Sequence, residues 1–235
     1  MKHPRVRTRT APGLEAELAA LGSCLAEVGM PLRPQQVAAL RHYVQLLLAW
    51  NRRTNLIAPG DEPVIVPRHI AESMAFFTVE EIAHGAMVVD IGSGGGLPGV
   101  PMKIVRPDLE MLLLEAQRRK VLFLQEVVDE LQLQGACALS TRAEMLANLP
   151  EWQGKVDVVV ARAVAKLATL WAWAAPLLGL QGKLITLKGG DVGGELRVLA
   201  AQEPSLSVRL AAPPSCLVAP DKGRVLIIVQ RGTQT

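Results

Sequence analysis

A glycine-rich segment at residues 90–96 carries the clearest chemical signal in this chain. It reads Asp-Ile-Gly-Ser-Gly-Gly-Gly and follows two valines, so an acid ends an apolar run and four glycines stand among the next residues. Glycine permits sharp turns and the close approach of a ligand to the backbone, but it destabilises a fold that needs neither. The segment therefore predicts a nucleoside-binding loop at the end of a strand.

Two cofactor signatures overlap in this loop. Gly94, Gly96 and Gly99 have the G-x-G-x-x-G spacing of a dinucleotide site, which leaves a nicotinamide-dependent oxidoreductase as an alternative. Pro98, however, stands where the phosphate-binding helix would start, and the segment 97–101 is not expected to form a regular first turn. The acid-x-Gly-x-Gly-x-Gly register is that of methyltransferases, whose S-adenosylmethionine has no pyrophosphate to bind. The predicted cofactor residues of the loop are Asp90, Gly92, Gly94 and Gly96.

Charged residues also follow the later apolar runs. Glu115 stands 25 residues after Asp90, where an acid can accept hydrogen bonds from both ribose hydroxyls. Glu144 can face the adenine edge, or it can interact with a helix N-terminus. Arg162 can present its fork to a carboxylate or phosphate, or form a salt bridge. Lys188 can face the substrate or the solvent.

A mostly parallel sheet is expected to position these residues. After residue 85, short β-branched runs alternate with helix-length segments, which is typical of βαβ units. The central residues of the first five runs are almost all apolar, as in strands covered by helices on both faces. The last two runs have no helical pattern between them, so they predict an antiparallel terminal hairpin. The seven predicted strands are Met87–Asp90, Met111–Glu115, Ala136–Ser140, Val156–Ala161, Lys183–Lys188, Ser207–Ala211 and Arg224–Gln230.

The first eighty residues predict a helical cap. Leucines recur at helical spacing over 14–25, and apolar residues do so again over 37–47, with Pro34 in a first turn. A turn-rich break at 58–63 precedes a short helix over about 68–77. We expect a tail and helical cap over 1–80 and a Rossmann-like α/β domain over 81–235.

Composition limits the classes of protein and partner. A formal charge of +3 does not by itself indicate a nucleic-acid binder, although basic residues gather in the first ten positions. The three cysteines lie far apart without a C-x-x-C pair, so neither a disulfide nor a metal site is expected, as suits a reducing cytoplasm. The longest uncharged apolar run, 167–180, is short for a membrane span, and no secretory segment is evident.

An ordered set of short motifs runs through the chain from about Leu32 to Gln230. In chain order these motifs are Trp50-Asn51, Asn55-Leu56, Arg68-His69, residues 90–99, Arg106-Pro107, residues 119–124, Arg142-Ala143-Glu144, Ala161-Arg162-Ala163 and Leu187-Lys188-Gly189. The set resembles the bacterial small-subunit rRNA guanine-N7 methyltransferases, also called glucose-inhibited division protein B. The Gly-Leu-Pro-Gly extension of the glycine loop and the Arg-His pair before it are particular to that family.

The resemblance implies a class I S-adenosylmethionine-dependent methyltransferase with seven strands and an N-terminal helical cap. The implied substrate is a guanine in the decoding-region loop of 16S rRNA, presented within the small ribosomal subunit to a monomeric enzyme. The implied cofactor contacts are Gly92, Leu97, Ala143, Glu144 and Arg162, with Glu115 at the ribose. Three departures affect mainly the substrate side: Ile57 replaces the usual threonine, Glu72 replaces an aspartate, and Arg119-Lys120 inverts the frequent order.

Guanine N7 carries a lone pair and no proton, so its methylation requires alignment rather than a general base. The residues expected to engage RNA phosphates or the guanine edge are Arg68, His69, Arg118, Arg119 and Lys120. The alternatives are a solvated helix turn at 118–120 and a buried or capping role for His69. Trp171 and Trp173 are expected in the core. A non-catalytic RNA-binding or assembly protein with the same fold remains a second alternative.

Overall fold

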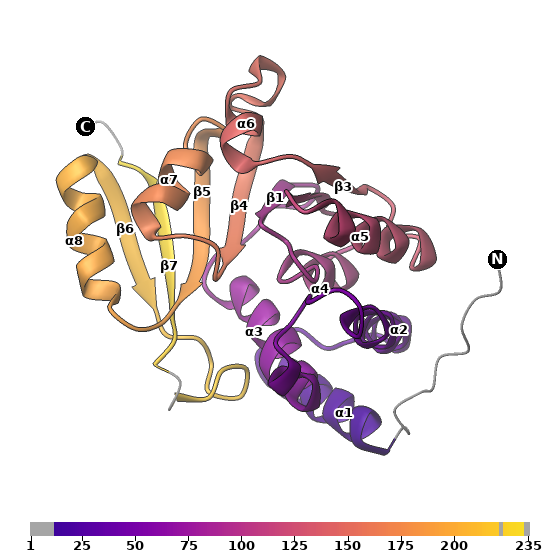
Figure 1. Cartoon of the computed structure of the whole chain (residues 1–235). Helices are drawn as coiled ribbons and strands as arrows, with labels where there is room; N and C mark the ends of the chain where they lie inside the picture. Colours follow the sequence, from indigo (N-terminus) through magenta and orange to yellow (C-terminus); the bar gives the residue numbers. More distant parts are fainter. Residues whose placement is uncertain (1–11, 221–222, 233–235) are drawn as a thin grey trace.

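The computed structural model describes residues 12–220 and 223–232, which fold around a seven-stranded sheet (Figure 1). The strands lie in the order β3-β2-β1-β4-β5-β7-β6. The first five pair in parallel, whereas β7 runs antiparallel to both β5 and β6. The predicted mostly parallel sheet with an antiparallel terminal hairpin is confirmed. The strands are β1 (Met87–Ile91), β2 (Glu110–Glu115), β3 (Ala136–Ser140), β4 (Val156–Arg162), β5 (Leu178–Lys188), β6 (Leu206–Ala211) and β7 (Val225–Arg231).

Strand β5 begins earlier than the sequence pattern predicts. Its first part, from Leu178, pairs with Val156, and the register then shifts before Lys183. Gly182 lies in this irregular part, where a Cβ would come 2.9 Å from the carbonyl oxygen of Val156. The glycine therefore permits a close backbone approach at a bulge, which interrupts the period-two pattern that identifies a strand in a sequence.

Helices cover both faces of the sheet. The predicted short helix over 68–77 is present, but its hydrogen bonding changes from π through α to 3-10 along its length. The N-terminal elements are α1 (Pro12–Glu27), α2 (Pro34–Asn51), η1 (Pro59–Val64), η2 (Ile65–Ile70), α3 (Ala71–Met74) and η3 (Ala75–Thr78). The later helices are α4 (Gly99–Val105), α5 (Arg118–Glu130), α6 (Ala143–Ala147), η4 (Pro150–Trp152), α7 (Leu167–Ala174) and α8 (Val192–Gln202).

Successive strand residues feed two separate hydrophobic clusters, because their side chains alternate between the faces of the sheet. Val88 and Val160 join the cluster that contains α1 to α5. Val89 and Val159 join the cluster on the other face, formed with α6, α7 and α8. In Figure 1 these two groups of helices lie on opposite sides of the strands. The strands are therefore buried on both faces, as their apolar composition predicts.

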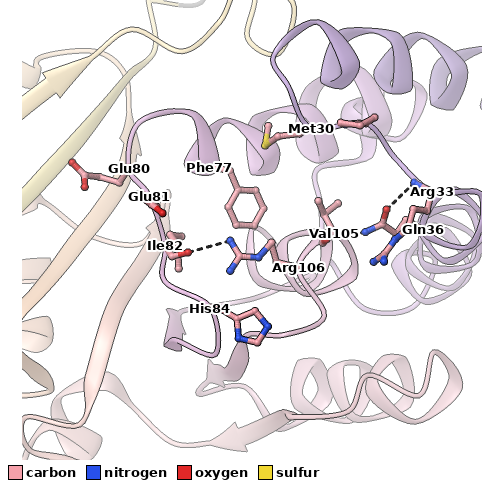
Figure 2. A pocket seen from close by; sticks show the side chains of 11 residues that line it. Met30, Arg33, Gln36, Phe77, Glu80, Glu81, Ile82, His84, Val105 and Arg106 are labelled. Carbon is pink, nitrogen blue, oxygen red and sulfur yellow. Dashed lines mark hydrogen bonds between the residues drawn. The ribbon is translucent and has the colours of Figure 1, made fainter.

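The N-terminal helices share one core with the sheet. Leucines of α1 and α2 belong to the same cluster as Val88 and Val160. A hydrogen bond also joins the two parts beside a cavity of about 560 Å³: Gln36 of α2 donates to the Val105 carbonyl at 2.8 Å. In the wall of the same cavity, Arg106 donates to the Ile82 carbonyl at 3.1 Å (Figure 2). The division of the chain near residue 81 stays a prediction.

A disulfide joins α1 to the loop before β7, and here the expectation of no disulfide is wrong. Cys24 and Cys216 are bonded, with Cα atoms 5.7 Å apart, although 192 positions separate them. Leu217 and Val218 pack into the same cluster as Cys24, which brings the two cysteines together. Sequence spacing cannot reveal such a pair.

Among the described residues, no helix is long and apolar enough to cross a membrane.

Candidate cofactor site

A cavity of about 400 Å³ opens at the carboxyl ends of the parallel strands. It lies beside β1 and β4, the two neighbouring strands between which the strand order reverses. Ligands usually bind at this point in α/β folds. Its volume falls in the range of small-molecule sites. The lining residues are Ile91, Gly92, Leu114, Glu115, Ala116, Gln117, Lys120, Thr141, Arg142, Ala143, Glu144, Arg162, Ala163, Val164 and Trp173.

The first half of the glycine loop forms part of the cavity wall. The amide groups of Gly92 and Ser93 both donate to the Leu114 carbonyl, at 2.8 and 3.0 Å, which turns the chain away from β1. Gly92 has a φ of 70°, a conformation that favours glycine. Its Cα also lies against the side chain of Val164. The turn and the close packing both explain the glycine at this position.

The second half of the loop supports helix α4 behind the cavity. The Asp90 carboxylate is fully buried, and its Oδ2 accepts a hydrogen bond from the Gly99 amide at 2.9 Å. Burial raises the pKa of Asp90 to about 7. A Cβ on Gly96 would meet Val100 at 2.6 Å, and Leu97 belongs to the hydrophobic core. Of the predicted cofactor residues, Asp90, Gly94, Gly96 and Leu97 are not in the cavity lining.

Helix α4 has no free N-terminus for a pyrophosphate. It begins at Gly99, directly after Pro98, so the expectation that this segment resists a regular first turn is wrong. Pro101 is tolerated because first-turn amides have no partner within the helix. The buried Asp90 carboxyl group already accepts the hydrogen bond of the Gly99 amide, so this amide is not available to a phosphate. This arrangement disfavours a dinucleotide more strongly than the prolines do.

Glu115 combines two functions at the end of β2. Its Oε2 accepts a hydrogen bond from the Gly94 amide at 3.0 Å, and its Oε1 accepts one from the Gln117 amide at 2.8 Å. The carboxylate thereby fixes the glycine loop while it lines the cavity. A carboxylate oxygen can accept more than one hydrogen bond, so both oxygens retain capacity for ligand hydroxyls. The position fits a ribose.

Arg162 lies at the end of β4, where the sequence predicts a site residue or a salt bridge. The salt bridge is present, whereas a cofactor contact stays a prediction. The side chain lines the cavity and is 8% exposed. Its Nη1 donates to Glu72 Oε2, and its Nη2 lies 2.9 Å from His69 Nδ1. His69 Nε2 in turn lies 3.0 Å from Asp61 Oδ2. Sequence reasoning did not single out Asp61, which no local motif connects to Arg162.

The two tryptophans of α7 occupy different environments. Trp171 is buried in the core, as expected, but Trp173 is only half-buried and lines the cavity. Residues two positions apart on a helix point about 200° apart, so the two side chains leave α7 in different directions. Trp173 packs against the cluster that contains Trp171 and also lines the cavity, which the sequence did not predict.

The predicted basic residues are divided between surface and interior. Arg118 and Arg119 are exposed in the first turn of α5, and Lys120 lines the cavity. Arg68 forms an ion pair with Asp61 and remains partly exposed. Lys188 is buried, with Nζ 2.8 Å from Glu195 Oε2, so it stabilises the packing of α8 on β5 instead of facing solvent. The exposed arginines of α5 remain available to a polyanion.

Solved structures place this fold in a class. The chain matches a precorrin-6y C5,15-methyltransferase from Geobacter metallireducens with a TM-score of 0.51 at 15% identity, covering 70% of this chain and 87% of that chain. It matches a SAM-dependent methyltransferase from Aquifex aeolicus with a TM-score of 0.51 at 15% identity, covering 72% of this chain and 93% of that chain. The sheet and its glycine loop define the Rossmann-like fold of the class I S-adenosylmethionine-dependent methyltransferases.

Sequence comparison narrows the class to one family. Residues 36–221 match the family model of rRNA small subunit methyltransferase G. A ribosomal RNA small subunit methyltransferase G from Moorella thermoacetica is 40% identical over 174 residues, which cover 74% of this chain and 72% of that protein. The one from Roseiflexus sp. is 34% identical over 88% of both chains. The chain therefore belongs to the rRNA small subunit methyltransferase G family.

Proposed function

We propose that this protein transfers the methyl group of S-adenosylmethionine to N7 of a guanine in the decoding-region loop of 16S rRNA. One observation carries the proposal: a chain of this family gathers Gly92, Glu115, Glu144 and Arg162 around one cavity at the carboxyl edge of its sheet. The occupied N-terminus of α4 argues against the alternative of a nicotinamide cofactor.

The residues present fit S-adenosylmethionine, which supplies an activated methyl group when it is bound. Glu115 would accept hydrogen bonds from the ribose hydroxyls, and Ala143 and Glu144 would face the adenine from the start of α6. Arg162 would bind the carboxylate of the methionine moiety with its planar fork. Gly92 allows the ligand to approach the backbone because it has no side chain.

Catalysis in this proposal consists mainly of alignment. Guanine N7 already offers a lone pair in the major-groove edge of the base, so no residue has to remove a proton before the methyl group moves. Holding the two reactants in line can contribute about 7–11 kcal/mol in favourable systems. The cavity wall formed by Gly92, Val164 and Trp173 would fix one reactant for this purpose.

We assign the RNA-facing surface to the start of α5. Arg118 and Arg119 are exposed, and Lys120 stands at the cavity itself. This places positive charge beside the proposed cofactor, where RNA phosphates must pass for a guanine to reach the methyl group. Arg68 can contribute through its exposed part, whereas His69 is engaged inside the protein. The partner is the small ribosomal subunit, and the protein acts there as a monomer in the cytoplasm.

The test is to incubate unmodified small ribosomal subunits with the protein and S-adenosylmethionine and to map 7-methylguanosine by chemical cleavage. A single new cleavage site in the decoding region is expected. Binding of subunits and cofactor without any new site would instead identify a non-catalytic assembly protein. Binding of NADH in place of S-adenosylmethionine, measured by titration, would support the oxidoreductase alternative and refute the proposal.

A further inference from the structure

We propose that His69, oriented by Asp61, and Glu72 are positioning residues that fix the guanidinium of Arg162 in the wall of the cofactor cavity. The inference rests on the proposed function, because it assigns the Nε–Nη2 edge of the Arg162 guanidinium, called the free edge below, to the carboxylate of S-adenosylmethionine. It gives the N-terminal helices a part in cofactor binding that acts through Arg162: Asp61 belongs to η1, His69 to η2 and Glu72 to α3.

The contacts to Arg162 all come from one short segment of the helical cap. Nη1 donates to Glu72 Oε2 at 2.9 Å and to the His69 carbonyl at 3.3 Å. Nη2 donates to His69 Nδ1 at 2.9 Å. The side chains of Arg162 and Glu72 are 8% and 5% exposed, so solvent screens this ion pair little. The cap therefore holds the guanidinium in one orientation.

Two N–H donors of Arg162 have no acceptor among the described residues. A guanidinium has five N–H donors, and three of them are used by His69 and Glu72. The other two belong to Nε and Nη2. Arg106 binds Asp108 through this pair of nitrogens, with Nε and Nη2 at 2.7 and 2.6 Å from the two carboxylate oxygens. In this proposal the Nε–Nη2 edge of Arg162 binds a carboxylate in the cavity that the residue lines.

The proton on His69 has a defined position. Arginine can only donate, so Nδ1 of His69 must accept and therefore carries no proton. Nε2 then carries the proton and donates to Asp61 Oδ2 at 3.0 Å. Asp61 selects this tautomer in the way that carboxylates orient histidines at metal and catalytic sites. Its other oxygen is held by Arg68, which braces the carboxylate in turn.

Burial, together with the neighbouring arginines, keeps His69 neutral. Burial and the positive charge of Arg162 lower the pKa of His69 to about 4, with Arg68 adding to the effect and Asp61 opposing it. Protonation of Nδ1 would replace its acceptor by a donor and set two positive charges side by side.

Arg162 itself is faced by negative and positive groups from other elements. Asp90 and Tyr43 lie near it, and Arg224 approaches the other oxygen of Glu72 at 3.5 Å. Glu72 is thus shared between two arginines, so its loss would leave both without their common partner.

Two ligands separate positioning of Arg162 from general disruption of the site. S-adenosylmethionine has the carboxylate that the free edge would bind, whereas 5′-methylthioadenosine has the same nucleoside without the amino-acid group. In the variant His69→Leu, calorimetry should show about tenfold weaker binding of S-adenosylmethionine, because a misaligned charged hydrogen bond is worth that factor. Binding of methylthioadenosine should stay within about twofold of wild type.

The conservative variant His69→Asn is the matched rescue. Its Oδ1 occupies the place of Nδ1 and can still accept from Arg162, but it cannot be protonated near neutral pH. Binding of S-adenosylmethionine should return to within about threefold of wild type. In wild type, the affinity for S-adenosylmethionine should fall as the pH falls toward about 4, the pKa of His69. The affinity of His69→Asn should not show this fall. Thermal melts of each variant verify that it is folded.

The outcomes separate this inference from the proposed function. Equal weakening of both ligands in His69→Leu, or no weakening of either, overturns the positioning role. A wild-type affinity that does not change with the titration of His69 also overturns it. Failure of wild type to bind S-adenosylmethionine at all refutes the proposed function instead, because that result does not depend on His69.

Discussion

The side chain of Val164 covers the Cα of Gly92 so closely that a Cβ built there would lie 2.8 Å from Val164 Cγ2. Val164 reaches this position through Ala163, whose φ of 56° is left-handed and rare for a residue with a side chain. The turns after β1 and β4 therefore pack against each other in the cavity that both of them line. A substitution that displaces one turn is expected to displace the other.

Gly92→Ala should consequently weaken cofactor binding by at least tenfold. The added methyl would displace Val164 and, at a φ of 70°, would also strain the backbone by about 1 kcal/mol. Calorimetric titration with S-adenosylmethionine measures the effect. The double variant Gly92→Ala, Val164→Ala should recover much of the affinity, because it removes the two Cγ atoms that clash.

Gly85→Ala is the matched control for backbone strain. Gly85 has a φ of 72°, but a Cβ there would meet nothing within 4 Å. Gly85→Ala should lose about as much folding stability as the positive φ alone costs in Gly92→Ala. It should retain full cofactor affinity. Equal affinity loss in both variants would show that strain, and not the contact with Val164, determines binding.

Asp90 should make the fold less stable as the pH rises. Burial raises its pKa from 3.8 to about 7, and a carboxyl whose pKa is raised by folding stabilises the fold fully below the unfolded pKa. That contribution is lost as the pH rises through the folded value of about 7. Asp90→Asn keeps an oxygen for the Gly99 amide but has no proton to lose. Its stability relative to wild type should rise between pH 4 and 8, by about 4 kcal/mol at most.

Urea denaturation of both proteins across this pH range measures the difference. Asp157→Asn is the control, because Asp157 is an exposed acid whose Oδ2 likewise accepts from a backbone amide, that of Met87. A rise of the same size in this control would mean that the effect comes from replacing a hydrogen-bonded acid and not from burial. A constant difference between Asp90→Asn and wild type would contradict the buried, near-neutral carboxyl.

Local patterns were sufficient to predict the sheet. Each central strand is a short apolar run whose alternate residues face the two clusters, so a window of a few residues contains the information. The glycine loop and Glu115 are also local, because they follow directly from strand ends. Gly92, Glu115 and Arg162 could therefore be placed at one edge without any knowledge of the helical cap.

The remaining features depend on contacts between distant segments. His69 and Arg162 are 93 positions apart, and no periodicity or motif connects a residue of a π-helix to the end of β4. The sequence predicts a ligand contact for the Asp90 carboxylate, because an acid at a strand end often has that role. Only the packed structure shows that it caps the amide of Gly99. Tertiary packing determines both outcomes.

Reversing the charge of Arg119 should separate RNA recognition from cofactor binding. Arg119→Glu replaces an exposed positive charge beside the cavity, so methylation of small subunits should fall by at least tenfold while the affinity for S-adenosylmethionine is unchanged. The salt dependence of subunit binding should also become shallower, because each lost phosphate contact lowers the slope by about 1.

The control is Arg197→Glu, which changes net charge equally on exposed α8, a helix that packs on the other face of the sheet from α5. Methylation by this variant should match wild type. If Arg119→Glu weakens cofactor binding as much as it weakens methylation, the arginine acts on the cofactor and the RNA-facing surface lies elsewhere.

The bond between Cys24 and Cys216 should raise thermal stability when it is formed. It closes a loop of 192 positions, and loss of chain entropy in the unfolded state would contribute about 5 kcal/mol for a loop of this length. A reducing compartment would keep the pair as the dithiol, so the measurement compares protein oxidised after isolation with reduced protein. Oxidised wild type should melt at a higher temperature than reduced wild type.

The variant Cys24→Ser should abolish this difference in melting temperature. The control Cys137→Ser, which removes the exposed free cysteine of β3, should retain it. A difference that persists in Cys24→Ser would mean that reduction acts on the fold through something other than this bond.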